Sequence, residues 1–282
     1  MKWENIMDYL YHYTSIETLA LILASKTLCF NNLLNVDDSE EAETFDMGKF
    51  GRFVYVSCWT SDERESIPLW NLYTPDMHGV RIRLPKFPFK KYSYNKDEYF
   101  FKERVETYIN IEKIYNENKV SIVATQPELV EIQYTDDKEK LYPKVRKVSS
   151  EEKFQQYLKD GMIENGKLDL SYSFAEIGKY KRKEWGFQKE WRYIYSVAPM
   201  GAKEANPPTI DKQIELIKRI ENKEYEPPYS RMFLDLDDNV LNNVEILCGP
   251  RMNDAEKVIV KALLKEYCPN GICKESKLKI RK

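Results

Sequence analysis

The stretch Trp185–Tyr195, WGFQKEWRYIY, decides the expected fold, and it predicts an aromatic β-strand with one carboxylate in its middle. Residues two apart share a face of a strand, so Glu190 and Arg192 point one way and the aromatic side chains point the other. The aromatic face, which should anchor the strand in the core, consists of Trp191, Tyr193 and Tyr195. Two interpretations of Glu190 stay open. It is either half of a surface ion pair with Arg192, since such pairs are common, or a catalytic carboxylate whose partners come from elsewhere in the chain.

A histidine stands near the amino end, in a short strand predicted over Tyr9–Thr14. The following Thr14–Glu17 (TSIE) fits a capping box, in which the Thr14 hydroxyl and the Glu17 carboxylate satisfy amides of the first helical turn. A helix should therefore follow the strand at once, and His12 should lie at a strand end that opens on a cleft. His12 is either a functional residue there or a histidine that only hydrogen-bonds a neighbouring carbonyl.

Two further segments predict a buried strand and a short aromatic helix. The continuous apolar run Phe53–Trp59 (FVYVSCW) is typical of a central strand, and Ser57 lies near its end. The segment PLWNLYT begins with Pro68, which suits the first turn of a helix. On that helix Trp70 and Tyr73 are three residues apart and share a face. Aromatic side chains at this spacing are usually core residues.

The chain changes in composition after the strand Val80–Leu84, whose alternation places Arg81 and Arg83 on one face. In residues 85–127, apolar positions recur at steps of three and four over Asp97–Lys119. This spacing predicts an amphipathic helix laid on the core, as a helical insertion in the domain.

Two charged clusters are interpreted as solvated faces. The acidic segment within Asn31–Glu43 suits the start of a helix, because carboxylates complement the positive end of the helix dipole; the alternative is a cation or ligand site. The basic cluster consists of Lys179, Lys181, Arg182 and Lys183. It is expected to be a solvated helix surface, with contact to a phosphate group as the alternative.

The remaining pattern predicts one α+β domain without internal repeats or a flexible linker. Its expected later elements are a helix opening at Ser149–Glu152, helices over 210–222 and after the cap Asn253, and strands over 128–135, 231–236, 244–248 and 277–280.

The composition limits the classes of protein to which this chain can belong. The chain has 282 residues, 42% of them hydrophobic, which suffices for a large core. The 44 Lys and Arg residues nearly cancel 46 Asp and Glu residues, so no global field draws the chain to nucleic acid or to an anionic membrane. The five cysteines form no CxxC pair and there are two histidines, so no metal site is expected. Without a signal-like start or a membrane-spanning run, a cytoplasmic location is expected.

The order of several short motifs resembles a bacterial family of uncharacterised proteins, the DUF2971 family, over nearly the full length of 1–282. The matching stretches are YHYTSIETLALILASKTLCFNN, NVDDSEE, VSCW, LWNLYTPDMHGVRIRL, EWGFQKEWRYI, ILCGPRMNDAEKVIVKALLKE and SKLKIR. Asp37 departs from the family pattern, which usually has Asn at that place.

That family in turn looks like a distant relative of the ADP-ribosyltransferases. The resemblance implies a mostly antiparallel split sheet with surrounding helices, and it implies a site built from His12, Tyr73 and Glu190. In this hypothesis His12 hydrogen-bonds the nicotinamide ribose of NAD and Tyr73 stacks on the nicotinamide. Glu190 stabilises the oxocarbenium-like centre that forms when the bond between nicotinamide and ribose breaks.

Further contacts to NAD are expected from hydroxyl and basic side chains. Thr14 and Ser57 would add hydrogen bonds, and the pyrophosphate would meet a charge-assisted donor. The candidates for that donor, between which the sequence does not choose, are Arg81, Arg83 and Lys181.

The implied function is an NAD-consuming enzyme that transfers ADP-ribose to a protein or nucleic-acid acceptor or hydrolyses NAD, as an effector in antiphage defence or a toxin system. A regulatory partner would then control it, and no membrane is involved. The alternative is a non-catalytic ligand-binding or sensor module on the same fold. An enzyme acting on nucleic acid is disfavoured, because no basic stripe interleaved with aromatics occurs.

Overall fold

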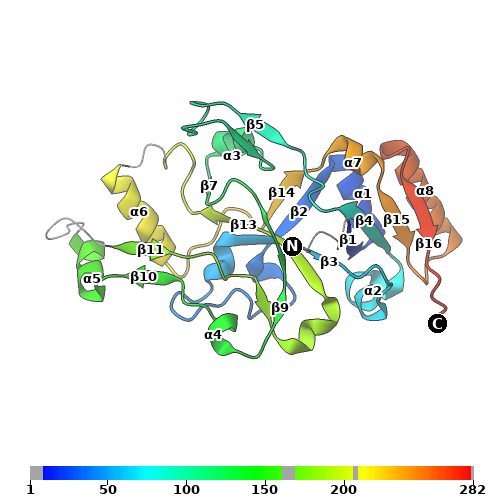
Figure 1. The fold of residues 1–282 in the computed structure, drawn as a ribbon, viewed down its shortest axis with the longest axis horizontal. Coiled ribbons are helices and arrows are strands. Elements are labelled where there is room, and N and C mark those ends of the chain that lie inside the picture. The colour runs from blue at the N-terminus through cyan, green and yellow to red at the C-terminus, as the bar shows by residue number, and fades with distance from the viewer. Residues whose placement is uncertain (1–8, 161–168, 206–208, 281–282) are drawn as a thin grey trace, which may run out of the picture.

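A computed structural model describes residues 9–160, 169–205 and 209–280 of the chain. It has an α+β fold in which helices surround one large sheet (Figure 1). The main path of the sheet is β14 (Arg231–Asp235), β2 (Thr27–Asn32), β3 (Val54–Thr60), β1 (Tyr9–Thr14), β4 (Val80–Pro85), β15 (Glu245–Cys248) and β16 (Ile272–Glu275). Neighbours on this path are antiparallel except β15 and β16, which are parallel. The predicted α+β domain is confirmed, with a mixed sheet.

The strand β13 (Glu190–Ala198) lies off this path and pairs with β3 over the whole length of β3, from Glu190 opposite Thr60 to Ser196 opposite Val54. Its other neighbours are β7 (Ser121–Ile122) and β8 (Glu128–Glu131). β13 therefore joins the amino-terminal strands to the middle of the chain.

The sheet is split on the other side of β3. There β2 pairs with the start of β3, where Asn31 lies opposite Val56. The strand β1 pairs with the end of β3, where Tyr11 lies opposite Thr60. Within the described chain, residues 57–59 have no registered strand partner on that side. The helix α1 (Ile16–Ser25) connects the two strands that border the gap.

The helix α1 shows how the local sequence sets this geometry. Its N-cap is Ser15, whose side chain accepts a hydrogen bond from the Thr18 amide at 3.1 Å, so the predicted cap at Thr14 is wrong by one residue. The helix buries Leu19 and neighbouring apolar residues, and it ends where Lys26 takes a left-handed conformation with φ of 54°. The chain can then turn directly into β2.

The stretch Trp185–Tyr195 is only partly a strand. A 3₁₀ segment, η4 (Lys183–Gln188), precedes β13, and Lys189 between them is left-handed with φ of 45°. Glu190 is thus the first residue of the strand and not its middle. The aromatic anchors are confirmed for Tyr193 and Tyr195, which are 1% and 3% exposed.

The predicted helix over Asp97–Lys119 is wrong, and residues 85–127 are not a helical insertion. The chain forms a hairpin of β5 (Tyr92–Tyr94) and β6 (Val105–Thr107), and a helix only at α3 (Ile111–Glu117). The aromatic residues at helical spacing pack instead within the hairpin, where the rings of Tyr94 and Phe101 stack with centroids 5.9 Å apart. The aromatic spacing that suggested a helix therefore belongs to a compact hairpin.

Two other predicted elements are also absent. No helix begins in the acidic segment of residues 31–43, which holds the 3₁₀ turn η1 (Leu33–Asn35), and residues 277–280 form no strand. The last strand is β16, four residues long, just before that segment.

The other elements surround the sheet, with α8 beside β15 and β16 at one end of the molecule and α5 and α6 at the opposite end (Figure 1). The helices are α2 (Ile67–Tyr73), α4 (Lys138–Leu141), α5 (Glu151–Asp160), α6 (Ile210–Glu221), α7 (Asp238–Asn242) and α8 (Asp254–Tyr267), with 3₁₀ turns η2 (Phe50–Phe53) and η3 (Pro75–Met77). The short sheets pair β10 (Arg146–Val148) with β11 (Leu170–Tyr172), and β9 (Gln133–Tyr134) with β12 (Tyr180–Lys181). None of the helices in the described ranges has the length and apolar character needed to cross a bilayer.

Gly79, between η3 and β4, should not tolerate a side chain. A Cβ there would stand 2.6 Å from the Thr14 carbonyl oxygen and 2.6 Å from the Thr74 Cβ. Gly79→Ala should lower the free energy of unfolding by about 1–3 kcal/mol, the usual cost of overpacking, as measured by urea denaturation. Gly186→Ala is the matched control, since its Cβ would meet nothing closer than a Tyr134 ring carbon at 3.9 Å. Equal effects of the two substitutions would contradict this packing.

Candidate functional site

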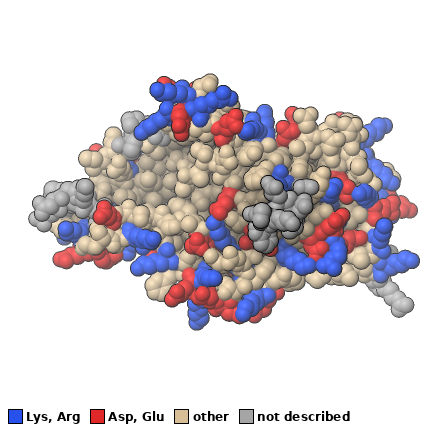
Figure 2. All heavy atoms as spheres, in the orientation of Figure 1, with Lys and Arg blue, Asp and Glu red and all other residues tan. Residues whose placement is uncertain are grey.

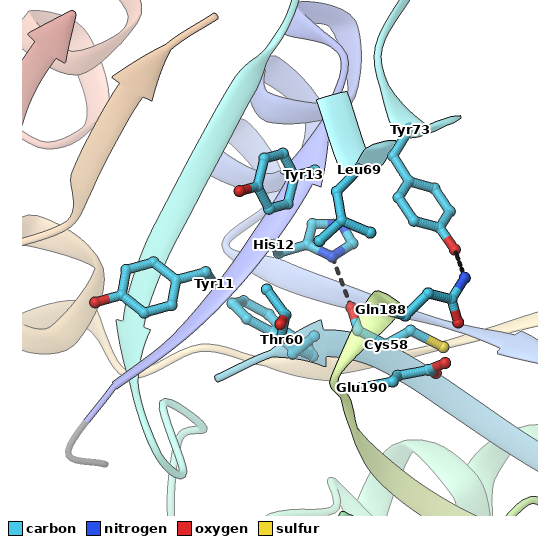
Figure 3. A pocket seen from close by; sticks show the side chains of 10 residues that line it. Tyr11, His12, Tyr13, Cys58, Thr60, Leu69, Tyr73, Gln188 and Glu190 are labelled. Carbon is cyan, nitrogen blue, oxygen red and sulfur yellow. Dashed lines mark hydrogen bonds between the residues drawn. The ribbon is translucent and has the colours of Figure 1, made fainter. Parts of the chain in front are cut away.

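Two adjoining cavities occupy the split in the sheet. The smaller, of about 60 Å³, is lined by Glu190 and Gln188 on one side and by residues of β1, β3 and α2 on the other (Figure 3). The larger, of about 410 Å³, extends from β1 and β3 along α1, β2 and β14. Both are lined by His12, Tyr13, Cys58 and Tyr73, so the two cavities adjoin and are together called the cleft. His12, Tyr73 and Glu190, from three distant segments, all line its smaller part.

The backbone around Glu190 is fixed from two sides. Its N–H donates a hydrogen bond to the Tyr134 hydroxyl oxygen at 2.9 Å. The hydroxyl of Thr60, opposite it on β3, donates to the carbonyl of Lys189 at 3.1 Å. The left-handed turn at Lys189 is thereby tied to the sheet, and it points the first side chain of β13 into the smaller cavity.

Glu190 belongs to a buried charge network of four side chains: Glu41, Lys181, Glu190 and Arg192. The Arg192 Nε donates to one carboxylate oxygen of Glu190, and the Lys181 Nζ lies 2.7 Å from the other. Arg192 also binds both oxygens of Glu41, and Lys181 lies 3.2 Å from Glu41. None of the four is more than 7% exposed, and their formal charges sum to zero. The predicted surface ion pair is therefore an interior one.

Glu190 is ionised at neutral pH. Burial acts to raise the pKa of its carboxyl, but Arg192 and Lys181 outweigh burial and lower the pKa to about 2. Burial, followed by the charge of this carboxylate, raises the pKa of the Cys58 thiol. Cys58 thus stays protonated and can donate its hydrogen to Glu190.

His12 crosses the gap between β1 and β3. Its Nδ1 lies 2.8 Å from the carbonyl oxygen of Cys58 (Figure 3), and its ring lies 5.1 Å from that of Trp59. A carbonyl accepts only, so Nδ1 carries the proton and Nε2 is left as an acceptor. Burial lowers the pKa of His12, more than the hydrogen bond to Cys58 raises it, which favours a neutral ring. His12 thus bonds a neighbouring carbonyl and also lines the cleft, and its functional role stays a prediction.

A hydrogen-bond chain connects Tyr73 to Glu190. The Gln188 amide donates to the Tyr73 hydroxyl at 2.6 Å, and Lys181 donates to the Gln188 carbonyl oxygen at 2.9 Å. Lys181 in turn binds Glu190. Burial, followed by the carboxylates of Asp37 and Glu190, raises the pKa of Tyr73, so this side chain is a neutral phenol.

The other predicted site residues divide into two groups. Thr14 and Ser57 are buried and line the larger cavity, where the Ser57 hydroxyl accepts a hydrogen bond from the Trp59 indole at 3.1 Å. Arg81 and Arg83 line neither cavity. Arg81 lies over the Tyr11 ring and donates to the Glu63 carbonyl, and Arg83 lies over the Tyr9 ring and pairs with Glu245.

Sequence reasoning named Lys181 only as a solvated residue or a candidate contact of the pyrophosphate, and it missed Glu41 and Arg231 as residues of the site. Lys181 was placed in a solvated basic cluster, but it is 3% exposed and lies in the charge network. Glu41 was placed in a solvated acidic segment, and it is buried against Arg192. Arg231, on the rim of the larger cavity, is exposed and forms no ion pair in the described part of the chain. Only the pairing across the fold distinguishes the first two from their solvated neighbours.

Comparison of the chain with protein-family models, with curated proteins and with solved structures found no match. The resemblance to the DUF2971 family and to the ADP-ribosyltransferases therefore stays a prediction. In residues 9–160, 169–205 and 209–280, no group of three or more His, Cys, Asp or Glu side chains is placed to hold a metal ion.

The charge network predicts a specific acid sensitivity. Glu190 has an ordinary pKa of 4.5 when unfolded and about 2 when folded, so it stabilises the fold above pH 4.5 and this stabilisation is lost as the pH falls towards 2. Urea unfolding between pH 5 and pH 3 should show a smaller loss of stability in Glu190→Gln than in the parent protein. Glu152→Gln, at an exposed carboxylate, is the control and should keep the parent slope. Identical slopes in all three proteins would contradict a depressed pKa of Glu190.

Proposed function

We propose that this protein cleaves the bond between nicotinamide and ribose in NAD, either by ADP-ribosyl transfer to a macromolecule or by hydrolysis, on an ADP-ribosyltransferase-like fold. The observation that supports it most is the convergence of His12, Tyr73 and Glu190 on one cleft. These residues lie on β1, α2 and β13, so nothing in their local sequence requires them to meet.

Glu190 has the charge that this reaction needs. Loss of nicotinamide leaves a positive, oxocarbenium-like ribose, and a fixed carboxylate in a dry site stabilises it. Arg192, Lys181 and the Cys58 thiol take three of the roughly four acceptor positions of a carboxylate. One position is left for a ribose hydroxyl or an attacking nucleophile, and its direction is set because the other three are held.

Tyr73 and His12 supply complementary contacts. The Tyr73 ring offers a flat surface for nicotinamide, and the bond from Gln188 holds its hydroxyl. The free Nε2 of His12 can accept a hydrogen bond from a ribose hydroxyl, because Nδ1 is committed to the Cys58 carbonyl.

The larger cavity suits the rest of the dinucleotide. Its volume of about 410 Å³ lies in the range of small-molecule sites, roughly 300–1,000 Å³. Thr14 and Ser57 supply hydroxyl groups to it. Arg231 is the cation on its rim without an ion pair in the described residues, so we assign contact with the pyrophosphate to Arg231 in place of Arg81 or Arg83.

One observation favours the second candidate, a sensor that binds a ligand without cleaving it. Glu190 is 4% exposed and paired on both oxygens, as expected of a carboxylate that holds the fold together. In a sensor the same cleft would bind NAD or a related nucleotide and the charge network would transmit its occupancy. The charges on the visible face are mixed in sign (Figure 2), so neither candidate is assigned a nucleic-acid partner on electrostatic grounds.

The two candidates differ in nicotinamide release. The purified protein, incubated with NAD and with cell extract as a source of acceptors, should release nicotinamide, measured by liquid chromatography. Glu190→Gln should reduce the rate by about 10²–10³-fold, the usual effect of removing one charge-stabilising group. Binding of NAD by the parent protein without any release would leave the sensor as the better account.

Glu41→Gln is the matched control for that experiment. It also removes one carboxylate from the buried network, at a similar cost of about 3–5 kcal/mol for leaving a charge unpaired, but Glu41 lines neither cavity. At a temperature where both variants are folded, Glu41→Gln should lose far less activity than Glu190→Gln. Equal losses would mean that the network acts only through folding.

Two substitutions of Tyr73 separate the contribution of its ring to NAD binding from that of its hydroxyl. Tyr73→Ala should weaken NAD binding by up to about tenfold, since ring contacts add about 0.5–1.5 kcal/mol. Tyr73→Phe keeps the ring and loses only the hydrogen bonds of the hydroxyl with Gln188 and Asp37, so it should bind NAD within about twofold of the parent protein. Isothermal titration calorimetry gives both Kd values, and equal Kd values in all three proteins would exclude stacking on Tyr73.

A further inference from the structure

Two cysteine side chains touch at the end of the sheet farthest from β14. The Sγ atoms of Cys248 on β15 and Cys273 on β16 are 3.6 Å apart. Ile246 lies opposite Cys273 in the parallel pair, and residues two apart share a face, so Cys248 lies on the same face as Cys273. Cys248 is fully buried, whereas Cys273 is partly exposed. One thiol of the pair is thus within reach of a small reagent, and the other lies directly behind it.

The pair differs chemically from the other thiols. The hydrogen bond from Cys248 lowers the pKa of Cys273 more than burial raises it, and Lys261 and Lys257 add to the lowering. The pKa values of Cys29, Cys58 and Cys268 are raised, chiefly by burial. Because the thiolate is the reactive form, Cys273 is the thiol prepared for attack.

We propose that Cys248 and Cys273 form a redox-active pair, which a hydroperoxide oxidises to a reversible intramolecular disulfide. The Cys273 thiolate attacks one peroxide oxygen of hydrogen peroxide; the O–O bond breaks, and the departing hydroxide takes a proton and leaves as water. The resulting sulfenic acid is attacked by the Cys248 sulfur, which gives up its proton, and the S–O bond breaks to release a second water. Two thiols lose two electrons, and one peroxide gains them.

The packing determines which strand closes the bond. A disulfide needs an S–S distance of about 2.05 Å, so the sulfur atoms must approach by roughly 1.5 Å. Gly249, next to Cys248, donates to the Gly79 carbonyl at 2.8 Å, and a Cβ on it would stand 2.5 Å from the Met77 carbonyl oxygen. β15 is therefore fixed against the neighbouring backbone. β16 stands at the end of the strand order and pairs only with β15 among the described strands, so β16 is the strand that moves.

The test uses the full chain in its native state. The protein is treated with excess hydrogen peroxide at pH 7.5, quenched with catalase, unfolded, alkylated and analysed by mass spectrometry of its peptides. We expect loss of two of the five free thiols and a disulfide between Cys248 and Cys273 that a dithiol reductant reverses. Earlier oxidation of Cys29 than of Cys273, or conversion of Cys273 to sulfinic acid while Cys248 stays alkylatable, would overturn the proposal.

Variants separate the roles of the two thiols. In Cys248→Ala the sulfenic acid of Cys273 has no thiol to close on, and a 1,3-dione probe should label it. In Cys273→Ser, a change at a partly exposed site, Cys248 should no longer be oxidised. Cys29→Ala, at a partly exposed thiol away from the pair, is the matched control and should form the disulfide as the parent does. Oxidation of Cys248 in Cys273→Ser would overturn the assignment of Cys273 as the attacking thiol.

Discussion

The cleft depends on the ionic bonding of Glu190 with Arg192 and Lys181 in the interior of the protein. A carboxylate moved alone out of water would take up a proton, because its charge is too costly to bury. Here Glu41 completes a network of zero net charge, and the guanidinium of Arg192 bonds to both carboxylates at once. Removing any member leaves a buried charge unpaired, so the network ties together chain segments that are far apart in sequence.

The split in the sheet places a cleft beside this charge network. Residues 57–59 of β3 have no registered partner between β2 and β1 in the described chain, and the cleft opens there. His12 bonds the Cys58 carbonyl across this gap, and a chain of hydrogen bonds runs from Tyr73 through Gln188 and Lys181. A ligand in the gap would therefore contact groups on both sides that are already held in place. This arrangement suits a site that binds without large rearrangement, whether or not it also cleaves.

Features with local causes could be predicted from the sequence. Alternation and apolar runs identified β1, β3 and β13, and a good N-cap placed α1 to within one residue. The prediction of a helix over Asp97–Lys119 was wrong, because aromatic residues three and four apart also fit a hairpin cluster. The solvated interpretation of Glu41 failed for another reason. Its partner Arg192 is 151 residues away, and no local pattern distinguishes a carboxylate that pairs in the core from its exposed neighbours.

The most direct test of this account is the titration of Glu190 itself. The carboxyl ¹³C chemical shift of Glu190, assigned by its absence in Glu190→Gln, can be followed by NMR in the folded protein from neutral pH downward. The account predicts that Glu190 keeps the chemical shift of its ionised form as the pH falls through 4.5. The chemical shift should change only near a pKa of about 2 or when the protein unfolds. A folded-state titration midpoint at or above 4.5 would contradict it, since Arg192 and Lys181 would then not hold Glu190 as a carboxylate.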